Sequence, residues 1–143
     1  MQSIVPARAL ESRTGSGHET VDGLFEGVGR RGAGSVTELQ VTDRAGVAAD
    51  ASAVVLNVTA VNPSAAGFVT VFPCGSSQPT ASNLNYVPGS VVPNAVIAKV
   101  GDDGNVCLFT SAETHLVVDI NAWFPDGASL QSIVPARALE SRT

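Results

Sequence analysis

THLVVDINAWF, at residues 114–124, is the strongest β-strand signal in the chain. Apolar and polar side chains alternate along it, which is the period of a strand with one buried face. The alternation predicts an inward set of Leu116, Val118, Ile120, Ala122 and Phe124, and an outward set of His115, Val117, Asp119, Asn121 and Trp123.

A second alternating run, SAVVLNVTAV at residues 52–61, indicates another core strand. The loop VNPSAAG and the strand GFVTVFPC follow it, an order that predicts a hairpin with a long turn. A tight hairpin is predicted at GDDG, between SVVPNAVIAKV and NVCLFTS, because Asp-Gly tolerates the positive φ values of such turns. One further strand each is expected in SVTELQV, SNLNY and the repeated SIVPARALESR, and a surface loop over the Gly-rich residues 15–34.

About eight short strands and no convincing helix predict an all-β domain. A two-layer antiparallel β-sandwich is the natural way for so many half-buried strands to cover their apolar faces. A closed β-barrel is the alternative.

The composition excludes several classes of partner. The net charge is −5, and the only basic cluster is Arg30-Arg31, so neither nucleic acid nor an anionic membrane surface is expected as a partner. No apolar run approaches the ~20 residues that span a bilayer, so membrane insertion is not expected. The start MQSIVPARAL lacks the pattern of a signal peptide.

The sequence QSIVPARALESRT occurs twice, at residues 2–14 and again at residues 131–143. An identical repeat of this length indicates one full period of a tandem array, followed by the start of the next copy. We therefore expect one module over residues 1–130, and a linker or exchangeable edge strand over residues 131–143. Met1 stands where the second copy has Leu130, which indicates an initiator placed on a fragment of a longer protein.

Each copy of the repeat combines a proline with three charged residues. Pro6 or Pro135 lacks an N–H, so the segment is expected at a sheet edge or a strand start. The two arginines of each copy flank a glutamate and are expected to form a small charge network. The residues concerned are Arg8, Glu11 and Arg13 in the first copy, and Arg137, Glu140 and Arg142 in the second.

Two copies of one strand compete for a single place in the module. The unplaced copy is expected to fray, to cover an equivalent edge, or to enter a neighbouring molecule by strand addition. Other copies of the same module are therefore the partner that the sequence predicts, with head-to-tail association as the result.

Several sequence blocks carry a resemblance to a known kind of module. PARALESRTG, VVLNVTAVNPSAAGFVTVFPCG, ASNLNY, VPNAVIAKVG and THLVVDINAWF resemble a tandem module of large secreted and surface proteins of actinobacterial type. The chain departs from that pattern at Ala9, Glu11, Ser12 and the pair Ala122-Trp123. The resemblance implies a secreted or cell-surface location and an array or accessory role, and it implies no catalytic residues.

Cys74 and Cys107 lie in two of the expected strands. A disulfide between them is the favoured interpretation, and two buried reduced thiols are the alternative.

No arrangement of residues in the sequence indicates an enzyme or a cofactor. The two histidines, His18 and His115, have no metal-binding or nucleophile-activating spacing. His115 and Asp119 share a strand face but are roughly 13 Å apart, too far for a hydrogen bond. Asp102 and Asp103 form a weak calcium candidate, for which a turn that favours Asp and Gly is the simpler explanation.

Two classes of function remain. The first is an extracellular structural module of a stalk, fibre or head-to-tail assembly, with the repeated strand as its joint. The second is a binding module for glycan or cell-wall polymer, in which exposed Tyr86 and Trp123 stack on sugars. Aromatic residues make up only 5% of the chain, which favours the structural class.

Overall fold

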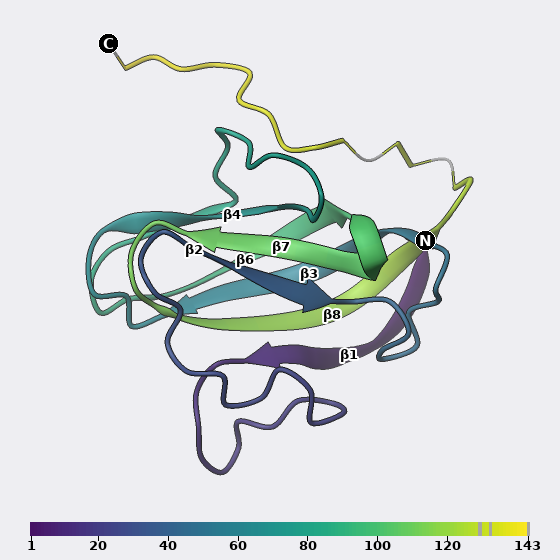
Figure 1. The fold of residues 1–143 in the computed structure, drawn as a ribbon, viewed down its shortest axis with the longest axis horizontal. Helices are drawn as coiled ribbons and strands as arrows, with labels where there is room; N and C mark the ends of the chain where they lie inside the picture. Colours follow the sequence, from purple (N-terminus) through teal and green to yellow (C-terminus); the bar gives the residue numbers. More distant parts are fainter. Residues whose placement is uncertain (129, 132, 143) are drawn as a thin grey trace.

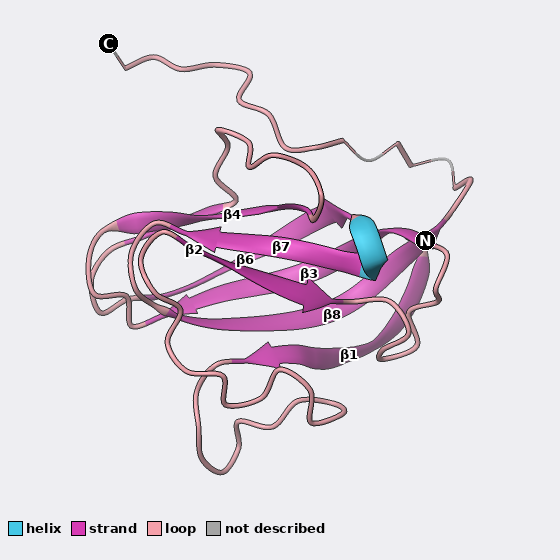
Figure 2. Ribbon diagram, in the orientation of Figure 1, coloured by secondary structure: helices cyan, strands magenta, loops and turns pink. Residues whose placement is uncertain are grey.

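The computed structural model describes residues 1–128, 130–131 and 133–142. Eight strands and one short 3-10 helix lie within residues 2–125 (Figures 1 and 2). In chain order they are β1 (Gln2–Glu11), β2 (Ser35–Gln40), β3 (Ala51–Val61), β4 (Gly67–Pro73), β5 (Leu84–Tyr86), β6 (Val91–Lys99), η1 (Asp102–Gly104), β7 (Asn105–Thr110) and β8 (His115–Pro125).

The strands form two antiparallel sheets of four strands each. The strand orders are β1-β8-β3-β6 and β2-β7-β4-β5. The two sheets do not close into a barrel, so the prediction of an all-β antiparallel sandwich is confirmed. The central strands β3 and β8 come from the two runs with the clearest alternation.

Side chains from both sheets meet in one apolar core. Alternate positions of β3 and of β8 up to Ile120 point into it, which is why the period of two in the sequence located these two strands. Its largest completely buried apolar side chains include Leu10, Leu39, Leu56, Leu108, Leu116 and Ile120.

Both predicted hairpins are wrong. β3 and β4 belong to different sheets, as do β6 and β7, so VNPSAAG and GDDG carry the chain from one sheet to the other. The positive φ values expected at GDDG are present at Asp103 and Gly104, but they shape the 3-10 turn η1. An alternating pattern shows which face of a strand is buried, but it does not determine which other strand lies next to it in the sheet.

A β-bulge reverses the predicted facing at the end of β8. Val55 of β3 pairs with Ala122 and Leu56 pairs with Ile120, so Asn121 is an extra residue on β8. Beyond an extra residue the side chains exchange faces. As a result Trp123 packs against the core, whereas the sequence predicted an inward Phe124 at this end of the strand.

Residues 12–34 form a long loop, which includes the predicted Gly-rich loop of residues 15–34 and lies beside β1 in Figure 1. The Arg44 side chain, which is buried, anchors it. Arg44 Nε donates to Asp22 Oδ2 over 2.7 Å, and Arg44 Nη2 donates to the backbone oxygen of Ala9 over 3.0 Å. One guanidinium therefore ties the loop to β1.

Candidate functional site

The first copy of the repeat is the edge strand β1, whose one neighbouring strand is β8. Its other side makes backbone hydrogen bonds with the loop that follows it, such as that from the Val21 N–H to the Arg8 oxygen over 2.9 Å. The register places Gln2 opposite Trp123 and Glu11 opposite Val117, so β1 begins where β8 ends. Pro6 lies in an irregular stretch between Ser3 and Ala7, where the regular pairing is interrupted. The edge position predicted from Pro6 is therefore observed.

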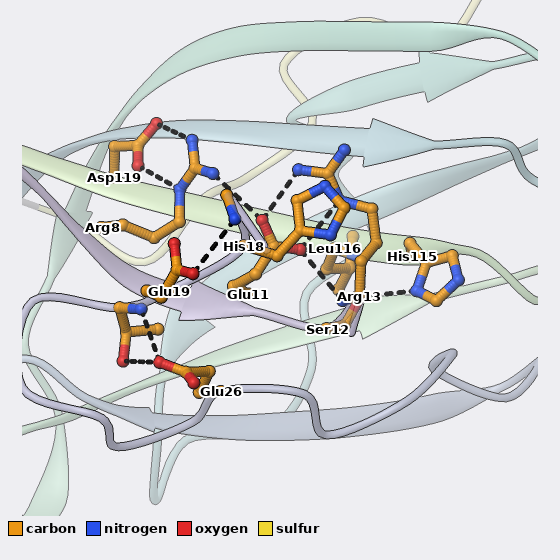
Figure 3. Close-up of polar contacts among 12 residues, drawn as sticks. Arg8, Glu11, Ser12, Arg13, His18, Glu19, Glu26, His115, Leu116 and Asp119 are labelled. Carbon is orange, nitrogen blue, oxygen red and sulfur yellow. Dashed lines mark hydrogen bonds and ion pairs between the residues drawn. The ribbon is translucent and has the colours of Figure 1, made fainter. Parts of the chain in front are cut away.

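A charge network fixes β1 to β8 (Figure 3). Arg13 donates to both carboxylate oxygens of Glu11, over 2.8 Å from Nε and 2.7 Å from Nη2. Arg8 Nη1 donates to Glu11 Oε2 over 3.0 Å, and Arg8 Nε donates to Asp119 Oδ1 over 2.9 Å. Arg8 thus joins the strand's own glutamate to an aspartate on its neighbour.

Glu11 is 0% exposed and still ionises readily. Burial by itself raises the pKa of this carboxyl, but the hydrogen bonds from Arg13 and the positive charges of Arg13 and Arg8 outweigh it, so its pKa lies below the ordinary value. A buried carboxylate with two guanidinium partners is costly to leave unpaired. Removal of either arginine should therefore weaken the attachment of β1.

The second copy lies outside the sandwich, where the chain runs past the loop that follows β4 (Figure 1). None of its described residues, 131 and 133–142, belongs to a strand, and Pro135 is among them. Ser132 and Thr143 lie outside the described residues. The place in sheet β1-β8-β3-β6 is therefore taken by the first copy.

The second copy nevertheless forms the same ion pairs within itself. Arg137 Nη1 lies 2.7 Å from Glu140 Oε2, and Arg142 donates to Glu140 over 2.8 Å and 2.6 Å. The side chain of Glu140 is 36% exposed, and the hydrogen bonds from Arg142 lower its pKa to about 2. The Arg-Glu-Arg arrangement is therefore a local property of the segment, present before the segment joins a sheet.

A serine–histidine contact that the sequence did not reveal closes β1 onto β8. Ser12 Oγ lies 2.9 Å from His115 Nδ1 and accepts a hydrogen bond from the Leu116 N–H over 2.9 Å. Ser12 is completely buried, so its hydroxyl is not placed to attack a substrate. Burial, followed by the charges of Arg30 and Arg13, lowers the pKa of His115.

Cys74 and Cys107 form a disulfide, which confirms the favoured interpretation of the two cysteines. It joins the residue after β4 to the middle of β7, and β4 and β7 are neighbours in one sheet. Phe72 and Phe109 pack with it in a small apolar cluster, separate from the main core.

The two aromatic residues proposed as glycan contacts are not exposed platforms. Tyr86 is 4% exposed, and its hydroxyl hydrogen-bonds to Thr110 Oγ1 over 2.7 Å and to the Ala112 backbone oxygen over 3.2 Å. The prediction of an exposed Tyr86 is therefore wrong, because its side chain fills the core between the sheets. Trp123 is partly buried, because the bulge at Asn121 turns its side chain towards the core.

The calcium candidate lies in the turn η1. The Asp102 carboxylate packs closely against Gly75, where a side chain would collide with it. Across the described ranges, no three His, Cys, Asp or Glu side chains form a group that could hold a metal ion. Within those same ranges, no helix is long and apolar enough to cross a membrane.

A hollow lies between the second copy and the loop that follows β4. Its lining consists of Phe68, residues 78–82, Asn85, Arg137 and Arg142, which include no histidine, cysteine or carboxylate. This lining offers no general acid or base. A second hollow lies along β1 and includes Arg8 and Glu19 in its lining.

Comparison with protein-family models, curated proteins and solved structures gives no match for this chain. The repeat and its geometry are therefore the features of the chain that indicate a function.

Proposed function

We propose that this chain is a structural module of an extracellular tandem array, in which copies of the module follow one another and hold a terminal part away from a surface. The observation that carries the proposal is the duplicated segment. One copy completes a sandwich as β1, and an identical copy follows the last strand β8 after only residues 126–130.

Continuation of the sequence beyond the second copy by another period would build another sandwich. Residues 131–140 would be its β1, because residues 131–142 repeat the side chains through which the first copy is held, including the counterparts of Ser12 and Arg13. The five-residue connection is too short to let large modules tumble independently. The array would therefore be a semi-rigid row of sandwiches.

An extracellular location is supported by the disulfide between Cys74 and Cys107, because disulfides persist in oxidising compartments and are rare in the cytosol. It is also supported by the resemblance to tandem modules of secreted proteins. The chain has few basic residues that could bind an anionic polymer, and Tyr86 is buried and cannot stack on a sugar. A spacer role is therefore better supported than recognition of a polymer.

The test is the shape of longer arrays. Chains with one, two and four periods of residues 2–130 should show a maximum dimension in small-angle X-ray scattering that increases by a constant step per module. In a matched series with a 20-residue Gly/Ser insert after Gly127, the maximum dimension should increase by a larger and less uniform step per module. Collapse of the four-period chain into one compact particle would contradict the array proposal.

A further inference from the structure

We propose that residues 131–142 can displace β1 from β8 within the same molecule, as the second strand of a β-hairpin, and release residues 2–14. This inference goes beyond the array, since it concerns a single chain. The binding site is the edge of β8 that β1 now occupies, and the occupant is the second copy of the repeat.

The direction of β8 makes the exchange possible. β1 runs antiparallel to β8 and starts opposite Trp123, near the C-terminal end of β8. A chain that leaves β8 and turns back therefore travels along this edge in the same direction as β1. Figure 1 shows the N-terminus beside the point where the chain leaves β8.

The turn that the exchange needs is already present. The Ala128 N–H donates to the Pro125 backbone oxygen over 3.2 Å, and Gly127 has a φ of 72°. Such a β-turn brings Ala128 within about 7 Å of Pro125. The place of Gln131 opposite Trp123 lies two residues back along β8, roughly 7 Å, and three residues of chain reach about 10 Å. The connection is therefore long enough.

The first copy of the repeat is held in place by partners that lie outside both copies. Asp119, His115 and Leu116 are on β8, and Arg44 holds the Ala9 carbonyl from another loop. The second copy would bring the same side chains to these partners, with its Arg-Glu-Arg arrangement already formed. The two arrangements therefore contain the same contacts and differ only in chain connectivity.

The loop after the first copy keeps anchors of its own when the first copy leaves. Arg44 is bound to Asp22, and the Arg31 and Thr114 backbones bond to each other over 2.8 Å and 3.1 Å. Both contacts join residues 15–34 to parts of the chain that do not move. Release of residues 2–14 therefore leaves most of this loop in place.

Exchange within one molecule is favoured over exchange between molecules. Transfer of the second copy into another molecule expels an identical β1 there, so no contacts are gained and translational freedom is lost. A short tether holds the second copy near its own β8 at an effective concentration of about millimolar. Below that concentration the intramolecular hairpin wins.

The test uses one substitution in either copy or in both. Leu10 is completely buried in β1, so Leu10→Asp places a charge in the core and should prevent the first copy from pairing with β8. We expect the Leu10→Asp chain to remain a folded monomer. In hydrogen-exchange measurements the amides of residues 133–142 should exchange more slowly than in the parent, and those of residues 2–11 should exchange faster. The matched Leu139→Asp chain should keep the pattern of the parent, and the double variant should lose protection along β8.

Three results would overturn the proposal. The first is a Leu10→Asp chain that unfolds as completely as the double variant. The second is a folded Leu10→Asp chain in which the amides of residues 2–11 still exchange slowly. The third is protection of the second copy that appears only in dimers, as seen by sedimentation.

A milder pair of variants gives an independent measurement. With exchange, Leu139→Ala leaves the unfolding equilibrium of the parent unchanged but destabilises a chain that already carries Leu10→Ala. The double alanine variant should then unfold with an equilibrium constant roughly 100-fold larger than the parent, as for a Leu→Ala change in a core. Equal unfolding of Leu10→Ala with and without Leu139→Ala would contradict the exchange and would leave the array proposal untouched.

Discussion

At the scale of single residues, the repeat carries its own counter-charges. Glu11 and its two arginines lie within six residues of each other, so the sequence predicted their network. Asp119, His115 and Arg44 contact this copy of the repeat from 35 to 111 residues away. Those partners depend on strand register and loop path, which local patterns do not encode.

The first prediction concerns Glu11. The double variant Glu11→Gln/Glu140→Gln, which removes the carboxylate from both copies, should lower the free energy of unfolding by about 2 kcal/mol at pH 7, because charge-assisted hydrogen bonds are lost. Urea unfolding measures the loss. Glu140→Gln alone should leave stability unchanged, since Glu140 lies outside the sandwich.

The same substitution has a pH dependence. The pKa of Glu11 in the folded protein lies below the ordinary carboxylate value of roughly 4.3, so its stabilisation is complete above that pH and is lost as the pH falls through the folded value. The curves for parent and double variant should therefore converge in acid. A difference that stays constant down to pH 2 would contradict this role.

The second prediction concerns His115, whose pKa is lowered by burial. Below the ordinary value of roughly 6.5 the unfolded chain binds a proton that the folded chain does not, so the free energy of unfolding should fall as the pH decreases from there. Chemical unfolding between pH 5 and pH 8 should show this slope, and His115→Gln should lack it. His18→Gln is the matched control and should retain the slope.

At the scale of elements, the sequence predicted where the strands lie but not how they pair. All eight strands lie in runs that were predicted to be strands, including the short β5, although only the runs of β3 and β8 alternate clearly. The two predicted hairpins failed because a turn such as GDDG reverses the chain equally well between sheets as within one. The bulge at Asn121 was missed because Ala122, Trp123 and Phe124 are all apolar, so the sequence fits either facing beyond it.

The third prediction concerns the disulfide. Its cysteines are 33 residues apart, and the chain-entropy relation gives about 3–4 kcal/mol for such a loop. Cys74→Ala/Cys107→Ala should lower the free energy of unfolding by that amount. Addition of reductant should destabilise the parent and leave the variant unchanged. An unfolding midpoint of the parent that is insensitive to reductant would refute the effect.

At the scale of the whole molecule, two identical segments share one site. The sequence could not show which copy is folded, because the copies have the same residues. Chain connectivity decides it: the first copy is joined directly to the loop that Arg44 holds against β1.

The fourth prediction concerns association of the intact chain. Exchange between molecules adds no contacts, so sedimentation should show monomers at micromolar concentration and head-to-tail oligomers only as the concentration approaches the millimolar value of the tethered copy. Removal of residues 131–143 should abolish those oligomers. Stable oligomers at micromolar concentration would show that another surface drives association.

The register of β1 and β8 also determines how a module would respond to force. Gln2 and Trp123 are opposite each other, so tension applied along an array would pull both strands apart from the same end. The hydrogen bonds between them would then break one after another, as in a zipper, and not all at once as in shear. A pulled module would peel open at β1 first and lengthen under low load, while the other sheet and its disulfide carried none of that load.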